Sequence, residues 1–266
     1  ETARVAAGHL RRTGLRGYLI YALCNLVTSS LEVGDWDAAE AILTVTVQED
    51  GVEEHDEIAC YRALFAALRG DVSTAEPLLA GLGELLQTEA PQERAFVLQA
   101  KAFTAAAAGR TRDAFDLARQ VVTLADALGI GSEQPRWNWP LAVRSAYELG
   151  DAAAVRELLE LLDAAQPGDI VPLLVSGRAL ARACLADLEG DEEAGPLFAA
   201  AVTSLREQGS PYHLAQGLLD QAGHLLRTGQ DARAAVEEAA TIATRLGAGP
   251  VLARAESLRR SLRSEL

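Results

Sequence analysis

The stretch "YELGDAAAVRELL" (residues 147–159) contains the pattern that decides the fold. One apolar run ends at Gly150, an aspartate follows, and a second apolar run begins. Glycine ends a helix well because it adopts a positive φ at little cost, and aspartate caps the next helix. In the second run Val155, Leu158 and Leu159 recur at helical spacing. The stretch therefore predicts two helices joined by a tight turn.

The same pattern recurs along the whole chain. Each instance has a glycine between two apolar runs, and the spacing between successive glycines is 36 to 41 residues. The six glycines are Gly34, Gly70, Gly109, Gly150, Gly190 and Gly229. An aspartate follows four of them. Such a regular spacing indicates an internal helical repeat.

Small or modest side chains flank every turn at fixed distances. Seven residues before each glycine stand Val27, Ala63, Ala102, Val143, Ala183 and Ala222. Five residues after it stand Ala39, Ala75, Ala114, Val155, Gly195 and Ala234. One of each pair lies on the first predicted helix and one on the second, so the two helices can pack closely there.

Composition agrees with a helical chain. Apolar residues make up 49% and aromatic residues 5% of the 266 residues, and alanine and leucine, both strong helix formers, dominate. We predict an all-α, right-handed α-solenoid of about seven helix-turn-helix pairs, the first one truncated, forming one domain over residues 1–266. The predicted helices are 1–12, 16–33, 36–48, 55–69, 72–87, 91–108, 111–128, 135–149, 152–164, 171–189, 192–207, 211–228, 231–246 and 249–264.

The charge balance argues against two classes of partner. The net charge is −14, from 24 basic and 38 acidic residues, whereas nucleic acids and anionic membranes are bound mainly through basic side chains. Arg254, Arg259, Arg260 and Arg263 interleave with acidic residues, which predicts a solvated helix face. No apolar run is long enough to span a bilayer, and no signal peptide is recognisable.

Three cysteines, Cys24, Cys60 and Cys184, lie far apart in apolar runs. An odd and scattered set is no disulfide framework and predicts buried thiols in a reducing, cytoplasmic compartment. The chain begins with Glu1 and has no methionine, so we expect a piece of a longer protein or a trimmed one.

The ladder of glycines and small residues resembles the tetratricopeptide repeat. The usual repeat has 34 residues with the outline W-x2-L-G-x2-Y…A-x3-F…P. Here the repeats are longer, the leading tryptophan is absent and the closing proline is mostly missing, so the chain looks like a divergent member.

Three stretches resemble the helical regions of large bacterial LuxR-type ATPase regulators and ATPase-linked adenylate/guanylate cyclases. They are "LRGYLIYALCNLVTSSLEVGDWDAAEAIL" (15–43), "EQPRWNWPLAVRSAYELGD" (133–151) and "GSPYHLAQGLLDQAGHLLRTGQDARAAVEEA" (209–239). The resemblance implies a sensing or interaction region of a transcriptional or signalling regulator, with ATPase, cyclase or DNA-binding domains elsewhere in the polypeptide.

No catalytic constellation is recognisable. The chain has no Gly-rich phosphate loop, no zinc signature and no G-x-S-x-G elbow, and its four histidines are scattered. We therefore expect no catalytic residue, cofactor or metal, and a non-catalytic protein-, peptide- or ligand-binding scaffold. Two alternatives stay open: a helical hydrolase or transferase with an unrecognised site, and a homo-oligomerisation module that uses an exposed apolar end helix.

The expected binding surface is a concave groove lined by the first helix of each pair. By analogy with the repeat family, its residues are Tyr21, Cys24, Thr28, Phe96, Gln99, Phe103, Trp137, Arg144 and Tyr147. Aromatic side chains with one arginine suit a protein, a peptide or a small amphipathic ligand. The alternative is that these side chains pack between repeats.

The stretch "GSEQPRWNWPLAVRSAYELG" (131–150) has two tryptophans close to two prolines. An interior proline disrupts a helix, so we predict that the regular helix begins near Pro140 or kinks there. Of the two tryptophans we expect Trp137 to face the groove, and we expect Trp36 to pack within its hairpin.

Overall fold

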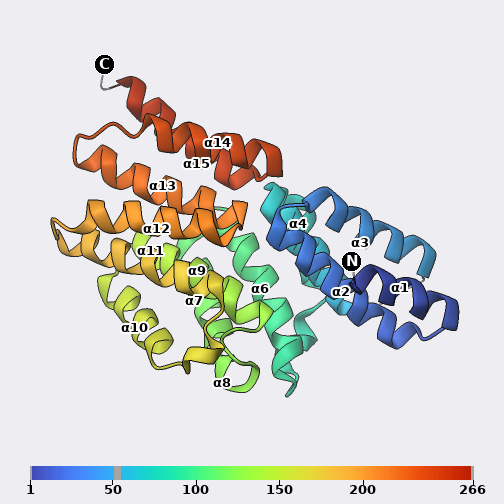
Figure 1. The fold of residues 1–266 in the computed structure, drawn as a ribbon. Helices are drawn as coiled ribbons and strands as arrows, with labels where there is room; N and C mark the ends of the chain where they lie inside the picture. Colours follow the sequence, from blue (N-terminus) through green and yellow to red (C-terminus); the bar gives the residue numbers. More distant parts are fainter. Residues whose placement is uncertain (1, 51–54, 265–266) are drawn as a thin grey trace.

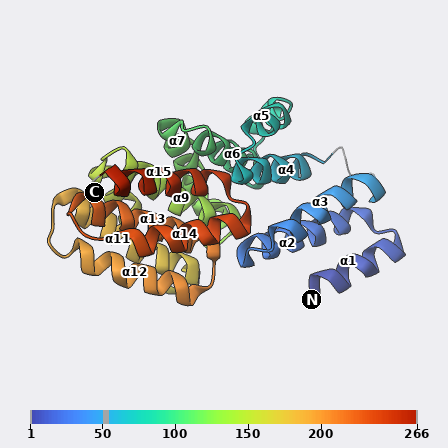
Figure 2. The same ribbon diagram turned by 90° about the horizontal axis from the view of Figure 1, so that it is seen from above.

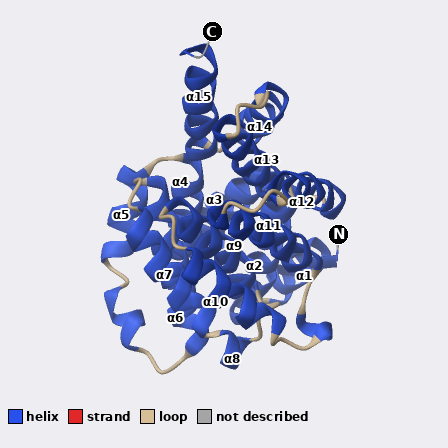
Figure 3. Cartoon of the chain, turned by 90° about the vertical axis from the view of Figure 1, so that its left-hand side faces the viewer, coloured by secondary structure: helices blue, strands red, loops and turns tan. Residues whose placement is uncertain are grey.

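The computed structural model describes residues 2–50 and 55–264, and within them the chain is helical without any strand (Figure 3). Two 3-10 helices, η1 (Gly83–Gln87) and η2 (Pro167–Asp169), accompany the α-helices. The α-helices are α1 (Thr2–Thr13), α2 (Arg16–Val33), α3 (Trp36–Asp50), α4 (Asp56–Arg69), α5 (Val72–Ala80), α6 (Pro91–Ala107), α7 (Thr111–Thr123), α8 (Ala125–Leu128), α9 (Glu133–Glu148), α10 (Ala152–Asp163), α11 (Pro172–Glu189), α12 (Ala194–Gln208), α13 (Pro211–Arg227), α14 (Arg233–Leu246) and α15 (Gly249–Ser264).

These bounds confirm the all-α prediction and most predicted helices, with three differences. The predicted helix 72–87 ends at Ala80, where two glycines follow within three residues, and continues as η1. The predicted helix 111–128 is divided into α7 and α8. The start near Pro140 is wrong, because α9 begins at Glu133 and runs through that proline. Burial of α9 on several faces favours the helix there despite the backbone hydrogen bond that proline removes.

The repeat turns follow the sequence prediction closely. All six ladder glycines have a positive φ, between 70° and 88°. Asp71 and Asp151 each cap the following helix by accepting a hydrogen bond from a backbone N–H three residues on. Asp191 does not, because α12 begins only at Ala194, and its carboxylate accepts from the N–H of Glu193 at 3.0 Å instead.

The predicted contact points between paired helices are buried, with two exceptions. The six small residues before the turns are all buried, as are Ala39, Ala75, Ala114 and Val155 after them. Gly195 is only half-buried and Ala234 is exposed. Helix α14 begins two residues later than predicted, at Arg233, so Ala235 and Val236 face the core in place of Ala234.

Helices that follow one another in the chain pack side by side, and helices near the two ends of the chain also meet. Helix α13 contacts α2, and α15 contacts α4, so the last helices return to the first ones (Figures 1 and 2). We call this contact of α2–α4 with α13–α15 the seam. It brings together residues that lie far apart in the sequence, such as Arg69 and Leu246, which are 177 positions apart.

Arg69, at the end of α4, is the main polar link across the seam. Its guanidinium donates to Glu40 and, at 2.6 Å, to Asp37 of α3, and also to the backbone oxygen of Leu246 at the end of α14. It lies over the ring of Trp36, 5.6 Å from the centroid. Trp36 is buried, and its indole N–H donates to the backbone oxygen of Leu31 within the predicted hairpin. Its ring also packs on Phe65 of α4 and on Tyr212 of α13.

Two further sequence expectations concern the thiols and the membrane. Cys60 and Cys184 are buried, Cys24 is half-buried, and all three are free. Burial raises the pKa of the Cys24 and Cys60 thiols to about 12, so neither is a reactive thiolate. Over the described ranges, no helix combines the length and the apolar character needed to cross a bilayer.

Candidate functional site

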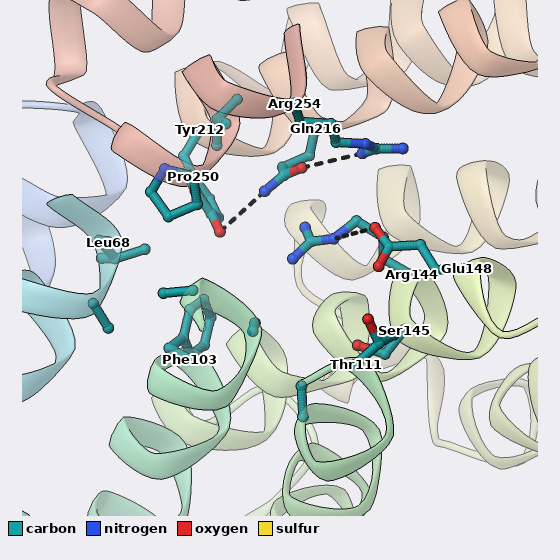
Figure 4. Close-up of a pocket in the computed structure, with 15 residues that line it drawn as sticks. Leu68, Phe103, Thr111, Arg144, Ser145, Glu148, Tyr212, Gln216, Pro250 and Arg254 are labelled. Carbon is teal, nitrogen blue, oxygen red and sulfur yellow. Dashed lines mark hydrogen bonds and ion pairs between the residues drawn. The ribbon is translucent and has the colours of Figure 1, made fainter. Parts of the chain in front are cut away.

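A cavity of about 190 Å³ lies at the seam, between helices from both ends of the chain (Figure 4). Six helices contribute to its wall: α4, α6, α7, α9, α13 and α15. The lining residues are Ala67, Leu68, Phe103, Ala106, Ala107, Thr111, Ala114, Arg144, Ser145, Glu148, Tyr212, Gln216, Pro250, Val251 and Arg254.

One side of the cavity is apolar. Phe103 of α6 and Leu68 of α4 supply large side chains, and Pro250, Val251 and several alanines complete the apolar lining. Ala67 of α4, Ala107 of α6 and Ala114 of α7 are among the lining residues, and their short side chains fill less space than larger residues would.

Arg144 of α9 is the central polar side chain of the opposite side. Its side chain is 14% exposed, and its Nε lies 3.9 Å from a carboxylate oxygen of Glu148, one turn along the same helix. Its two terminal nitrogens have no hydrogen-bond partner among the described residues. Figure 4 shows the guanidinium pointing into the space between Phe103 and Tyr212. A ligand can therefore reach the free edge of the guanidinium.

Arg254 of α15 also lines the cavity, but its charge is already compensated. It donates to Asp220 of α13 at 2.6 Å, and Asp220 is 1% exposed. Burial is the strongest single influence and lowers the pKa of the Arg254 guanidinium, but the carboxylates of Asp220 and Glu148 and the hydrogen bond to Asp220 together raise it above its ordinary value. The prediction that Arg254 belongs to a solvated face is wrong, because α15 packs on α13 and α14.

A short chain of hydrogen bonds joins the Arg254 guanidinium to the Tyr212 hydroxyl. Arg254 donates to the side-chain oxygen of Gln216 at 3.4 Å, and the Gln216 amide donates to the Tyr212 hydroxyl at 3.2 Å. The hydroxyl proton of Tyr212 has no acceptor in the described chain, so it is available to a ligand. The neighbouring Ser145 hydroxyl is likewise without a side-chain partner there.

An aromatic cluster forms the back of the cavity. Trp137 stacks on Tyr212 with ring centroids 5.8 Å apart and an angle of 19° between the planes. Phe103 and His213 contact the same indole at 6.2 and 4.7 Å. Trp137 is completely buried, so the expectation that it faces an open groove is wrong. Helix α13 occupies the place where that groove was expected.

His213 is a neutral member of this cluster. Burial, followed by the positive charges of Arg144 and Arg136, lowers the pKa of its imidazole to about 3. Its Nδ1 is hydrogen-bonded to the Ser210 hydroxyl at 2.9 Å. His213 therefore serves as an aromatic packing residue and carries no charge at neutral pH.

Among the described residues, Phe103 and Arg144 are the two predicted groove residues that line the cavity. Thr28 instead bonds to the Tyr61 hydroxyl at 3.0 Å, and Phe96 packs against the ring of Tyr61 at 5.5 Å. Gln99 is buried, and its side-chain nitrogen has no partner. Cys24 packs at the edge of the core. These four side chains pack between helices, as the alternative prediction holds.

The remaining two predicted residues lie in different surroundings. Tyr21 of α2 is 70% exposed. Tyr147 of α9 donates to Asp187 of α11, which also bonds to His224 at 2.6 Å and to Arg227, both of α13. Burial opposes the charge on Asp187, but these hydrogen bonds lower the pKa of its carboxyl. The network joins three helices.

The pair Asp187 and His224 bears on the enzymatic alternative. A carboxylate on the Nδ1 of a histidine orients the ring in many hydrolases. Here His224 is 6% exposed, and its Nε2 faces α12 at Gly195. The outer nitrogen thus packs against a helix backbone, which is the arrangement of a structural contact.

Neither a metal cluster nor a known relative guides the assignment further. Within the described residues, no group of three or more His, Cys, Asp or Glu side chains is placed to hold a metal ion. No known protein family matches the chain, and no curated protein matches it.

Proposed function

We propose that this chain is a non-catalytic binding module built as a right-handed solenoid of about seven helix pairs that closes on itself at the seam. The even glycine ladder and the packing of successive helices support the solenoid. The contacts of α13 with α2 and of α15 with α4 support the closure.

The seam cavity is the proposed binding site, and the observation that carries this is its lining. Apolar side chains face a small number of convergent polar groups whose hydrogen-bonding capacity is unused, above all the free edge of Arg144. Small-molecule sites have this composition. The aromatic groove positions, in contrast, are filled by the protein's own helix α13, which favours a small ligand over an extended peptide.

The wider setting follows from the sequence resemblance alone. We propose that the module is a cytoplasmic sensing region of a larger bacterial transcriptional or signalling regulator, and that ligand binding at the seam is the event it senses. A ligand that touches both ends of the chain stabilises the closed arrangement by mass action.

The cavity is tested by filling it. Ala107 lines the cavity, whereas the next residue, Ala108, is exposed at the end of the same helix. We expect a small-fragment library screened by ligand-observed NMR to yield binders of the wild-type protein. The Ala107→Phe variant loses those binders because the new ring occupies their space, and Ala108→Phe keeps them.

Circular dichroism and thermal melts establish that both variants fold. Binders that persist in the folded Ala107→Phe variant place the site elsewhere and refute the proposal, as does a wild-type protein that binds no fragment.

A further inference from the structure

The seam cavity contains several hydrogen-bond donors that no acceptor of the described chain uses. The two terminal nitrogens of Arg144 have no partner in the described chain, and the hydroxyl protons of Tyr212 and Ser145 have no acceptor there. Glu148 is the one carboxylate among the lining residues. It lies beside the Nε edge of Arg144, which leaves the forked edge of the guanidinium open. A ligand that uses these donors must present acceptors.

The electrostatic balance favours a negatively charged acceptor. Arg254 is matched by the buried carboxylate of Asp220, so it supplies little net attraction. Arg144 has only a single 3.9 Å contact with the more exposed Glu148. Its positive charge also reaches His213 and helps to lower the pKa of that imidazole. The open fork of a guanidinium binds a carboxylate through two parallel hydrogen bonds.

The volume limits the size of the ligand. An apolar cavity of about 150 Å³ holds benzene, and the seam cavity has about 190 Å³. One ring with a short acidic side chain, on the order of ten non-hydrogen atoms, fits that space. The apolar side, with Phe103 and Leu68, lies opposite Arg144 in Figure 4.

We propose that the seam cavity binds a small monocarboxylate with a compact apolar body, such as an aryl-acetic acid. The ring lies against Phe103 and the alanines, the carboxylate accepts two hydrogen bonds from Arg144, and Tyr212 donates a third. This inference rests on the proposed function, since it names the ligand class of the same cavity.

The test is isothermal titration calorimetry with four probes. Phenylacetate carries the ring and the charge, phenylacetamide keeps the shape without the charge, and phenethylamine reverses the charge. The tripeptide Gly-Gly-Phe with a free carboxylate represents a peptide end. We expect phenylacetate to bind the wild-type protein more tightly than the other three.

Variants assign the interaction to Arg144. Removing a charged hydrogen-bond partner weakens binding by roughly tenfold or more, so we expect Arg144→Gln to lose about that much affinity for phenylacetate. Its weak affinity for phenylacetamide stays the same. Arg144→Lys keeps the charge but not the fork, and its affinity falls between. Arg206→Gln, at an exposed arginine paired with Glu238, leaves all affinities unchanged.

The outcomes distinguish a wrong ligand class from a wrong binding site. If phenylacetamide or phenethylamine binds as tightly as phenylacetate and the Ala107→Phe variant abolishes that binding, the site stands and the carboxylate class is wrong. Tighter binding of the tripeptide overturns the small-molecule assignment. If Arg144→Gln, folded by circular dichroism, keeps the wild-type affinity for phenylacetate, the proposed contact is refuted. Binding of no probe or fragment at all refutes both proposals.

Discussion

His213 illustrates how single residues at the seam serve packing first. Its ring touches Trp137 and Tyr212, and burial together with nearby arginines keeps it neutral. Arg144 reaches the same region from α9 and leaves its forked edge open. His213 therefore packs in the core, whereas the neighbouring Arg144 offers hydrogen-bond donors.

Acid destabilises this protein through His213. The folded pKa of about 3 lies below the ordinary 6.5, so the unfolded chain takes up the proton first. The contribution of neutral His213 to the free energy of unfolding is fully present above pH 6.5. As the pH falls from 6.5 toward 3, the free energy of unfolding decreases by about 1.4 kcal/mol for each pH unit. Urea unfolding at pH 7.5, 5.5 and 4.5 measures it.

A comparison of variants isolates the contribution of His213 to the pH dependence of stability. We expect the free energy of unfolding to fall less steeply on acidification in His213→Gln than in the wild-type protein. His55→Gln, at an exposed histidine, retains the wild-type slope. Equal slopes for the wild-type protein and His213→Gln would contradict the account.

At the scale of the helices, local sequence signals predicted most of what the structure contains. The ladder glycines end helices with a positive φ, and two of the following aspartates cap the next helix. The failures also have local causes. Pro140 predicted a boundary, but burial of both neighbouring tryptophans outweighs its effect on the helix. The late start of α14 shifted the buried face by one residue, from Ala234 to Ala235.

The aspartate cap of α10 gives a direct test of these turn signals. The Asp151 carboxylate accepts from the N–H of Ala154 at 3.0 Å. We expect Asp151→Ala to lower the free energy of unfolding by about 1 kcal/mol and the melting temperature by about 2–4 °C. Asp151→Asn keeps a capping oxygen and melts near the wild-type temperature. Equal melting temperatures for the alanine and asparagine variants would show that the cap contributes nothing.

At the scale of the whole molecule, the sequence predicted the repeat but not its closure. Phe103 and Arg144 were found because the repeat register places them on the first helices of their pairs. Tyr212, Gln216 and Arg254 were missed. They reach the cavity because α13 and α15 contact α2 and α4. In the proposed solenoid, this contact depends on how small rotations between successive pairs add up. No local spacing in the sequence predicts the sum of these rotations.

The seam depends on a close approach of two backbones at Gly249. A methyl group there would overlap the carbonyl oxygen of Arg69 and lie 3.4 Å from the Cα of Gly70. Gly249 does not have a positive φ, so alanine strains only the contact and not the local backbone. We expect Gly249→Ala to cost about 1–3 kcal/mol of stability. Gly81→Ala, where no atom stands within 4 Å, costs far less.

Small-angle X-ray scattering of the wild-type protein and of these two glycine variants tests the closure most directly. The wild-type and Gly81→Ala profiles should match the profile calculated from the closed structure. The Gly249→Ala profile should show a larger radius of gyration, because α15 moves away from α4. A wild-type profile of an extended superhelix, or a Gly249→Ala variant with unchanged scattering and stability, would contradict the claim that the chain closes over a binding cavity.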